Sequence, residues 1–202
     1  MLIEYLGHSC FFVKGASFSV VIDPFGGIGY GLKRVDCDYA ISSHGHFDHN
    51  NFSGVNAKKT IVSSFGPFTA VPCFHDDANG LKRGKNNAFF FDADGLRLLH
   101  LGDLGEPFSV RNAEKFKVGA DVLFLPVGGN YTIDGKAAAA YAKEIGARVT
   151  VPMHYKTENS VIDISGPEEF LGYFPGYKTV KKSFELTAEN LNGFSPVTFI
   201  EF

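Results

Sequence analysis

Three histidines and an aspartate lie within six residues of this sequence, at His44, His46, Asp48 and His49. In an extended chain, residues two apart face the same side, so His44 and His46 can bind one metal ion from a strand end. Asp48 and His49 follow directly and can serve a second ion. Zinc and similar metals favour imidazole nitrogen and carboxylate oxygen as ligands. The spacing therefore suggests two adjacent metal ions, with a solvated polar loop as the alternative.

Two metal ions need more ligands than this segment supplies, and three further candidates each follow an apolar run. They are His75, Asp103 and His154. In layered folds, functional side chains commonly lie at strand ends. A hydrogen-bonded structural role is the alternative for each residue singly, but the three together favour metal binding.

Short apolar and β-branched runs predict the strands that would position these side chains. Strands are expected over residues 2–6, 10–14, 18–22, 39–42, 60–63, 69–74, 88–92, 97–101, 122–126, 148–152 and 196–202. Asp94-Gly95 is a favoured tight-turn pair, so the two runs beside it are expected to form an antiparallel hairpin.

Two helices are expected in the second half of the chain. One spans residues 110–118 after Ser109 as its N-cap, and the other spans 134–145, beginning with a capping Asp and stopping at Gly146. This mixture of strands and helices predicts an α+β or layered α/β architecture.

The order of the candidate ligands resembles that of the metallo-β-lactamase superfamily, in which H-x-H-x-D-H is followed by single His, Asp and His residues at strand ends. The resemblance runs almost end to end and implies a four-layer αββα sandwich with a dinuclear metal site along one edge. Further segments resemble a small, lactonase-like branch of zinc-dependent hydrolases: Leu6-Gly-His-Ser-Cys-Phe, Ile22-Asp-Pro, Leu101-Gly-Asp-Leu-Gly, Pro126-Val-Gly-Gly and Pro152-Met-His-Tyr.

The resemblance also assigns the ligands to two metal sites. The first site would take His44, His46 and His75, the second would take Asp48, His49 and His154, and Asp103 would bridge them. The expected cofactors are two divalent metal ions, with zinc expected and Mn²⁺, Ni²⁺ or Fe as alternatives. A Glu in place of the second His is typical of di-iron electron-transfer relatives, so His46 disfavours a redox role.

Two such ions could share a hydroxide and polarise a substrate oxygen, which favours hydrolysis. Asp48 would be the catalytic residue, because it could hold the second metal and also orient the attacking water or accept its proton. A small ester, lactone or phosphodiester is expected as the substrate, and a β-lactam is not. An iron-dependent, oxygen-using enzyme and a non-catalytic metal-binding protein of the same fold are the alternatives.

Five other residues near these motifs have more than one interpretation. His8 is expected in a supporting or packing role, not as a ligand, and His100 in a structural hydrogen bond. Asp23 either ends a strand or orients a ligand histidine. Tyr155 is a candidate for steadying the leaving group. Arg83 could contact a substrate anion, with a solvated flexible turn as the alternative.

Composition and charge limit the partners that this protein can have. The 202 residues are 45% hydrophobic and 20% charged, which fits one globular domain spanning 1–202. A net charge of −3 offers no basic field for nucleic acid, so the expected partner is a small-molecule substrate. No apolar run is long enough to span a membrane and the start lacks a signal peptide's features, so a cytoplasmic protein without membrane partners is expected. Formation of a homo-oligomer stays open.

Overall fold

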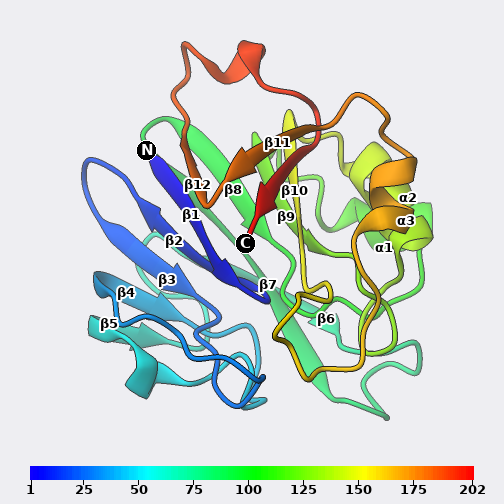
Figure 1. The fold of residues 1–202 in the computed structure, drawn as a ribbon, viewed down its shortest axis with the longest axis horizontal. Helices are drawn as coiled ribbons and strands as arrows, with labels where there is room; N and C mark the ends of the chain where they lie inside the picture. Colours follow the sequence, from blue (N-terminus) through cyan, green and yellow to red (C-terminus); the bar gives the residue numbers. More distant parts are fainter.

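Two β-sheets packed face to face form the centre of the protein in the computed structural model, which describes residues 1–202 (Figure 1). The first sheet has the strand order β12-β1-β2-β3-β4-β5. Its strands are β1 (Leu2–Gly7), β2 (Cys10–Lys14), β3 (Ser19–Ile22), β4 (Asp36–Ile41), β5 (Asn56–Ile61) and β12 (Ser183–Glu185).

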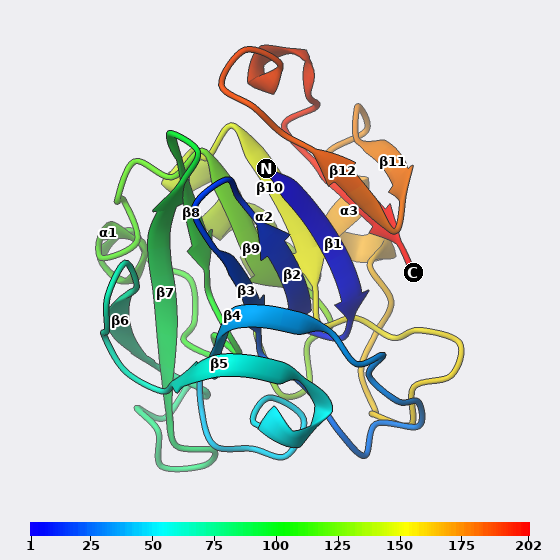
Figure 2. The same cartoon turned by 90° about the vertical axis from the view of Figure 1, so that its left-hand side faces the viewer.

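The second sheet has the order β10-β9-β8-β7-β6. Its strands are β6 (Thr69–Phe74), β7 (Lys85–Ala93), β8 (Leu96–His100), β9 (Val122–Pro126) and β10 (Val149–Met153). Figure 2 shows β1 and β2 in front of β9 and β10, which makes the face-to-face stacking visible. A small third sheet pairs β11 (Lys178–Lys181) with β13 (Thr198–Glu201).

Alternation of side chains along the strands builds a core on each face of the first sheet. In β3, Val20 and Ile22 join the large core that continues into the second sheet, whereas Val21 joins a smaller cluster on the opposite face. Phe11 and Phe124 connect the two sheets, with ring centroids 4.4 Å apart. Phe68, Phe89, Phe91 and Phe116 belong to the same core, so packing accounts for several of the 21 phenylalanines in the sequence.

The three α-helices lie together beside the second sheet (Figure 1). They are α1 (Val110–Glu114), α2 (Gly135–Ile145) and α3 (Glu168–Gly172). The α2 helix begins and ends as expected, because the Asp134 carboxylate accepts a hydrogen bond from the Ala137 N–H and Gly146 adopts the left-handed conformation. No helix is long and apolar enough to cross a membrane.

The outer face of the first sheet is covered differently, by Phe25 and Ile28 of the loop after β3 and by residues next to the 3₁₀ helix Phe52–Gly54. Their apolar side chains cluster with Val21 and Ala40 of the sheet. The α+β sandwich predicted from the sequence is confirmed, with a loop and a 3₁₀ turn forming this outer layer in place of an α-helix.

Strand direction explains how distant residues reach one edge of the sandwich. In the first sheet, β3 runs parallel to β4, and two antiparallel steps through β2 make β1 parallel to them as well. In the second sheet, β8 and β10 are parallel to β9, and two antiparallel steps through β7 make β6 parallel to β8. The carboxyl ends of β1, β3 and β4 therefore share one edge of their sheet, and those of β6, β8 and β10 share one edge of theirs.

Most elements agree with the sequence prediction, and the differences are instructive. The expected hairpin forms, with Ala93 paired to Leu96 and positive φ at Asp94 and Gly95. The helix expected over 110–118 ends at Glu114, and β4 and β5 begin three to four residues earlier than predicted. The α3 helix and the short strands β11 and β12 were not predicted, since their apolar patterns span only three to five residues.

Candidate metal centre

Side chains from both sheets meet where these strand ends come together. The loop 44–49 follows β4, His75 follows β6, Asp103 lies three residues after β8, and His154 follows β10. All seven residues singled out in the sequence fall into overlapping groups whose candidate ligand atoms lie within 4.8 Å of one another. The structure therefore brings together residues separated by up to 110 positions in the chain.

Asp103 lies at the centre of this cluster and is only 1% exposed. The Nε2 atoms of three histidines lie 3.0, 3.1 and 3.2 Å from its Oδ2 atom, and belong to His49, His75 and His154 respectively. The Nε2 atom of His44 lies 4.0 Å from the same oxygen. One carboxylate oxygen is thus shared by histidines from both sheets.

His44, His46 and His75 form a group on one side of Asp103. His44 Nε2 lies 3.0 Å from His46 Nδ1, and the His75 ring centroid lies 4.7 Å from that of His44 and 5.0 Å from that of His46. These three side chains are the ones that the family resemblance assigns to the first metal site.

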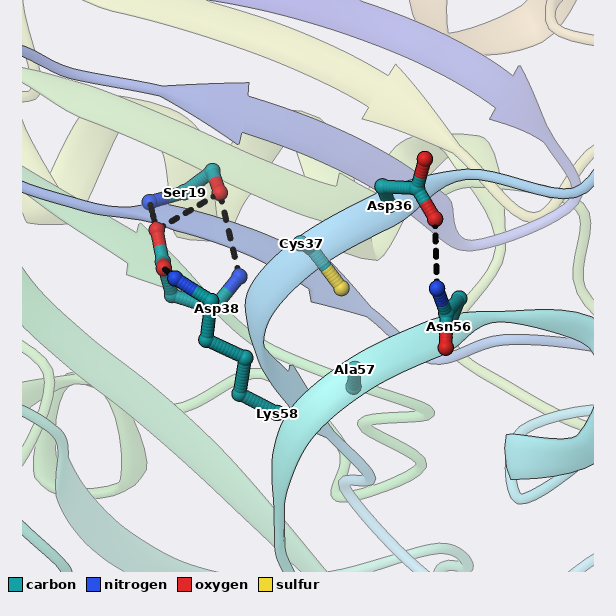
Figure 3. A pocket seen from close by; sticks show the side chains of 7 residues that line it. All are labelled: Ser19, Asp36, Cys37, Asp38, Asn56, Ala57 and Lys58. Atoms are coloured by element: carbon teal, nitrogen blue, oxygen red, sulfur yellow. Dashed lines mark hydrogen bonds and ion pairs between the residues drawn. The ribbon is translucent and has the colours of Figure 1, made fainter.

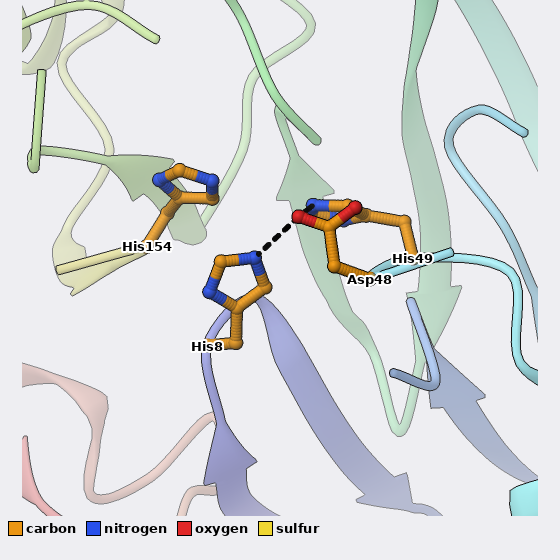
Figure 4. A group of neighbouring side chains, drawn as sticks. All are labelled: His8, Asp48, His49 and His154. Carbon is orange, nitrogen blue, oxygen red and sulfur yellow. Dashed lines mark hydrogen bonds and ion pairs between the residues drawn. The ribbon is translucent and has the colours of Figure 1, made fainter. Parts of the chain in front are cut away.

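A second group contains Asp48, His49 and His154, together with His8 (Figure 4). His8 follows β1 and its Nε2 atom lies 3.3 Å from Asp48 Oδ2. The His8 ring centroid is 4.3 Å from that of His154. His8 was expected only to support or pack against the site, but it lies at the same distances as the predicted ligands.

His49 and His75 are oriented by partners on their outer ring nitrogens. His49 Nδ1 donates a hydrogen bond to Oδ2 of Asp23 at 3.0 Å, and Asp23 also accepts from the backbone N–H and hydroxyl of Ser43. His75 Nδ1 donates to the carbonyl oxygen of Tyr131 at 3.1 Å. Both bonds direct Nε2 at the centre, which is how outer partners fix a metal-binding histidine.

The backbone conformation at Gly102 places Asp103 at the centre of the cluster. Gly102 has φ +55, and a Cβ there would approach Asn86 Oδ1 to 2.4 Å, so only glycine fits. The same Asn86 oxygen accepts a hydrogen bond from the Asp103 N–H, while the Asn86 amide donates to the carbonyl of Leu101. Asn86 therefore holds both sides of the turn that carries Asp103.

Burial and mutual proximity set the protonation of these groups. Burial and the neighbouring His154 lower the pKa of His8 to about 4, and burial and His49 lower the pKa of His44 to about 3. Burial opposes the charge of Asp103, but His154 and His49 hold its pKa well below the usual range. At neutral pH, His8 and His44 are neutral imidazoles, the form that binds metal ions, and Asp103 is a carboxylate.

The donor set fits divalent metal ions. Two ligands of a tetrahedral zinc ion, each about 2.0–2.1 Å from it, are roughly 3.3 Å apart. The distances of 3.0 to 3.3 Å measured around Asp103 and Asp48 are close to that separation. Oδ1 of Asp103 is also buried without a hydrogen-bond partner, which is costly unless another group binds it.

A pocket of about 360 Å³ opens onto the cluster. This volume lies near the lower end of the range for small-molecule sites, about 300–1,000 Å³. It is lined by His46, Phe47, Asp48, His75, Arg83, Asp103, Tyr131 and Ile162. The pocket gives a small molecule direct access to the candidate metal ligands.

A second hollow, of about 370 Å³, lies at the amino-terminal ends of β3, β4 and β5 (Figure 3). Its polar side chains bond to one another: the Asp38 carboxylate accepts from Ser19 and Lys58, and the Asp36 carboxylate accepts from Asn56. Because the metal-centre residues follow the carboxyl ends of β3 and β4, this hollow is at the opposite end of the sheet from them.

Two other predictions concern residues beside the cluster. His100 has the expected structural role, since its Nε2 donates to the carbonyl of Ser9 and its Nδ1 accepts from the Gly102 N–H. The suggestion that Tyr155 steadies a leaving group is wrong, because its hydroxyl is buried and donates to the carbonyl of Ile200.

Comparison with known proteins extends these observations. The chain matches the family described as beta-lactamase superfamily domain over residues 2–154. A UPF0173 metal-dependent hydrolase from Alkaliphilus metalliredigens is 30% identical over 209 residues, covering 84% of this chain and 91% of that protein. A solved structure from Thermotoga maritima, assigned to the Zn-dependent hydrolases of the metallo-β-lactamase superfamily, has a TM-score of 0.79 at 31% identity and covers 99% of this chain and 98% of that one.

A more distant structure, a metallo hydrolase from Ignicoccus hospitalis, shares the fold with a TM-score of 0.66 at 20% identity, covering 92% of this chain and 99% of that one. Since the family match covers most of the chain, this protein belongs to the metallo-β-lactamase superfamily. Within the superfamily, its relatives place it among the metal-dependent hydrolases.

Proposed function

We propose that this protein is a hydrolase with a dinuclear zinc centre that cleaves a small ester, lactone or phosphodiester bond. The observation that carries the proposal is the convergence of His49, His75 and His154 on one buried carboxylate oxygen of Asp103. Since both sheets contribute to this centre, we infer that residues 1–202 act as one domain.

The ligands divide between two metal ions on either side of Asp103. His44, His46 and His75 would hold the first ion, and Asp48, His49 and His154 would hold the second. Nitrogen and oxygen donors of this kind suit zinc, and the same set also accepts Mn²⁺, Ni²⁺ or Fe.

When bound, the two ions supply a water of lowered pKa and polarise the oxygen of the scissile group. The Asp48 side chain is 14% exposed and lines the pocket, so its carboxylate can orient the attacking water and accept its proton. Asp23 and the carbonyl of Tyr131 keep the rings of His49 and His75 in fixed orientations, so the centre needs little rearrangement.

The pocket favours a small substrate. Its volume of about 360 Å³ suits a single small molecule, and its wall contains the apolar or aromatic side chains of Phe47, Tyr131 and Ile162 beside the charged groups. The net charge of −3 also disfavours a polyanionic polymer.

Turnover of ester, lactone, cyclic phosphodiester and β-lactam panels by zinc-loaded protein tests this function. The wild type should hydrolyse one of the first three classes. Asp48→Asn should lose most of that activity, while Asp36→Asn, an exposed change at the far end of β4, should retain it. Activity that survives removal of the metal, or a β-lactam hydrolysed faster than every other class, would contradict the proposal.

A further inference from the structure

Arg83 is a cationic side chain in the wall of the pocket that opens onto the metal centre. It is half-buried, and its guanidinium group makes no ion pair, whereas the adjacent Lys82 is paired with Asp77 at 2.6 Å. The carboxylates that share the pocket, Asp48 and Asp103, are occupied by their histidine neighbours. Arg83 therefore presents an uncompensated positive charge to whatever enters the pocket.

The loop that carries Arg83 is built around one buried carboxylate. Asp76 is 2% exposed and accepts four backbone hydrogen bonds of 2.7 to 2.9 Å, from the N–H groups of Ala78, Gly80, Lys82 and Arg83. The loop is therefore ordered and is not a flexible solvated turn, because Asp76 bonds directly to the backbone of Arg83.

Tyr131 places the Arg83 side chain relative to the metal centre. The guanidinium carbon lies 5.3 Å from the centroid of the Tyr131 ring, a distance typical of a cation–π contact. The carbonyl of the same Tyr131 accepts the hydrogen bond from His75 Nδ1. Tyr131 thus contacts both Arg83 and the candidate metal ligand His75. Asp76, which follows His75 in the chain, holds the backbone of Arg83 through a hydrogen bond.

We propose that Arg83 and Tyr131 form an anion-binding subsite, and that the substrate carries a carboxylate or phosphate group in addition to the bond that is cleaved. Arginine binds both groups through two parallel N–H donors, and stacking on an aromatic ring limits its freedom before binding. Phe47 and Ile162 complete the wall, so the body of the substrate between anion and metal centre is apolar or planar. This inference rests on the proposed function for the bond that is cleaved, but the binding of the anion does not depend on turnover.

Binding of non-hydrolysable probes to the zinc-loaded protein tests the subsite. Isothermal titration is performed with phenylphosphonate, benzoate and neutral benzamide, on the wild type, Arg83→Gln, Arg83→Lys and Lys82→Gln. Removal of a charged hydrogen-bonding partner should raise the Kd of at least one anionic probe about tenfold or more in Arg83→Gln. The Kd for Arg83→Lys should lie between the values for the wild type and Arg83→Gln. The Kd for Lys82→Gln, which removes a neighbouring charge from the same loop, should stay within about twofold of the wild-type value. The probe that responds identifies the anion as phosphate-like or carboxylate-like.

Three results would overturn the subsite. One is a Kd for both anions in Arg83→Gln that matches the wild type, which would mean that the probes bind the metal ions alone. Another is an equal loss in Lys82→Gln, which would indicate a general charge effect. The third is a reduced zinc content of Arg83→Gln, which would show that the residue acts through the centre. A protein that binds an anion through Arg83 and hydrolyses nothing would contradict the proposed hydrolysis and leave the subsite standing.

Discussion

His8 and Asp48 contact each other within one group of the candidate metal centre, with His8 Nε2 3.3 Å from Asp48 Oδ2. His8 is 2% exposed and has φ +56, a backbone conformation that is uncommon for residues other than glycine. Its ring also packs on His154. A strained, buried residue that touches two of the proposed ligands of the second metal ion is expected to support that ion.

We therefore expect His8→Ala to weaken binding of the second zinc ion about 10–100-fold, the usual cost of losing an outer partner of a metal ligand. Zinc titration against a competing chelator measures this. His8→Gln, which can still donate a hydrogen bond to Asp48, should recover part of the affinity. Unchanged affinity for both ions in His8→Ala would mean that the contact has no role in metal binding.

Asp23 should also support zinc binding, because it contacts the outer ring nitrogen of His49. In Asp23→Asn the amide has one oxygen to accept from Ser43 and His49, where the carboxylate has two. We expect weaker zinc binding, again by about 10–100-fold, and a lower thermal stability because the position is fully buried. Zinc affinity equal to that of the wild type would show that His49 is oriented without Asp23.

Tyr155→Phe should lower the stability of the protein without changing its catalytic rate. The hydroxyl donates to the carbonyl of Ile200 at 3.0 Å inside the core, so its loss should cost about 1 kcal/mol of unfolding free energy. For a chain of this length, that corresponds to roughly 2–4 °C in Tm. The rate of hydrolysis under saturating zinc should not change. A fall in kcat with an unchanged Tm would show that Tyr155 takes part in the reaction.

The sequence predicted much of this site because metal chemistry restricts residue types strongly. His44, His46, Asp48 and His49 stand out by their spacing alone, and the apolar run before His154 marks a strand end. The structure brings these residues together because parallel strands of each sheet end at the same edge.

His8 shows what the sequence could not provide. It too follows a strand, but a lone histidine between Gly7 and Ser9 has no partner nearby in the chain, and its approach to Asp48 depends on the direction of β1 within the sheet. Arg83 was ambiguous for a related reason, because the four donors to Asp76 that order its loop are backbone groups without a sequence signature.

The short elements near the C-terminus were missed on physical grounds as well. Strand β12 pairs with β1 through only three residues, Ser183–Glu185, too few to display an alternating pattern. Similarly, α3 (Glu168–Gly172) has no side-chain cap at Pro167, and its five residues are too few to display a helical period.

Metal content measured on protein purified without chelator and then reconstituted with zinc tests the central claim most directly. Two equivalents per chain are predicted, and their removal by chelation should lower Tm, because a bound ion at 100 times its Kd contributes about 2.7 kcal/mol. Asp103→Ala should retain fewer than two equivalents, since it removes the carboxylate that contacts histidines on both sides. A reproducible stoichiometry of zero after reconstitution with zinc or manganese would contradict the account, and a stoichiometry of one would refute the dinuclear centre.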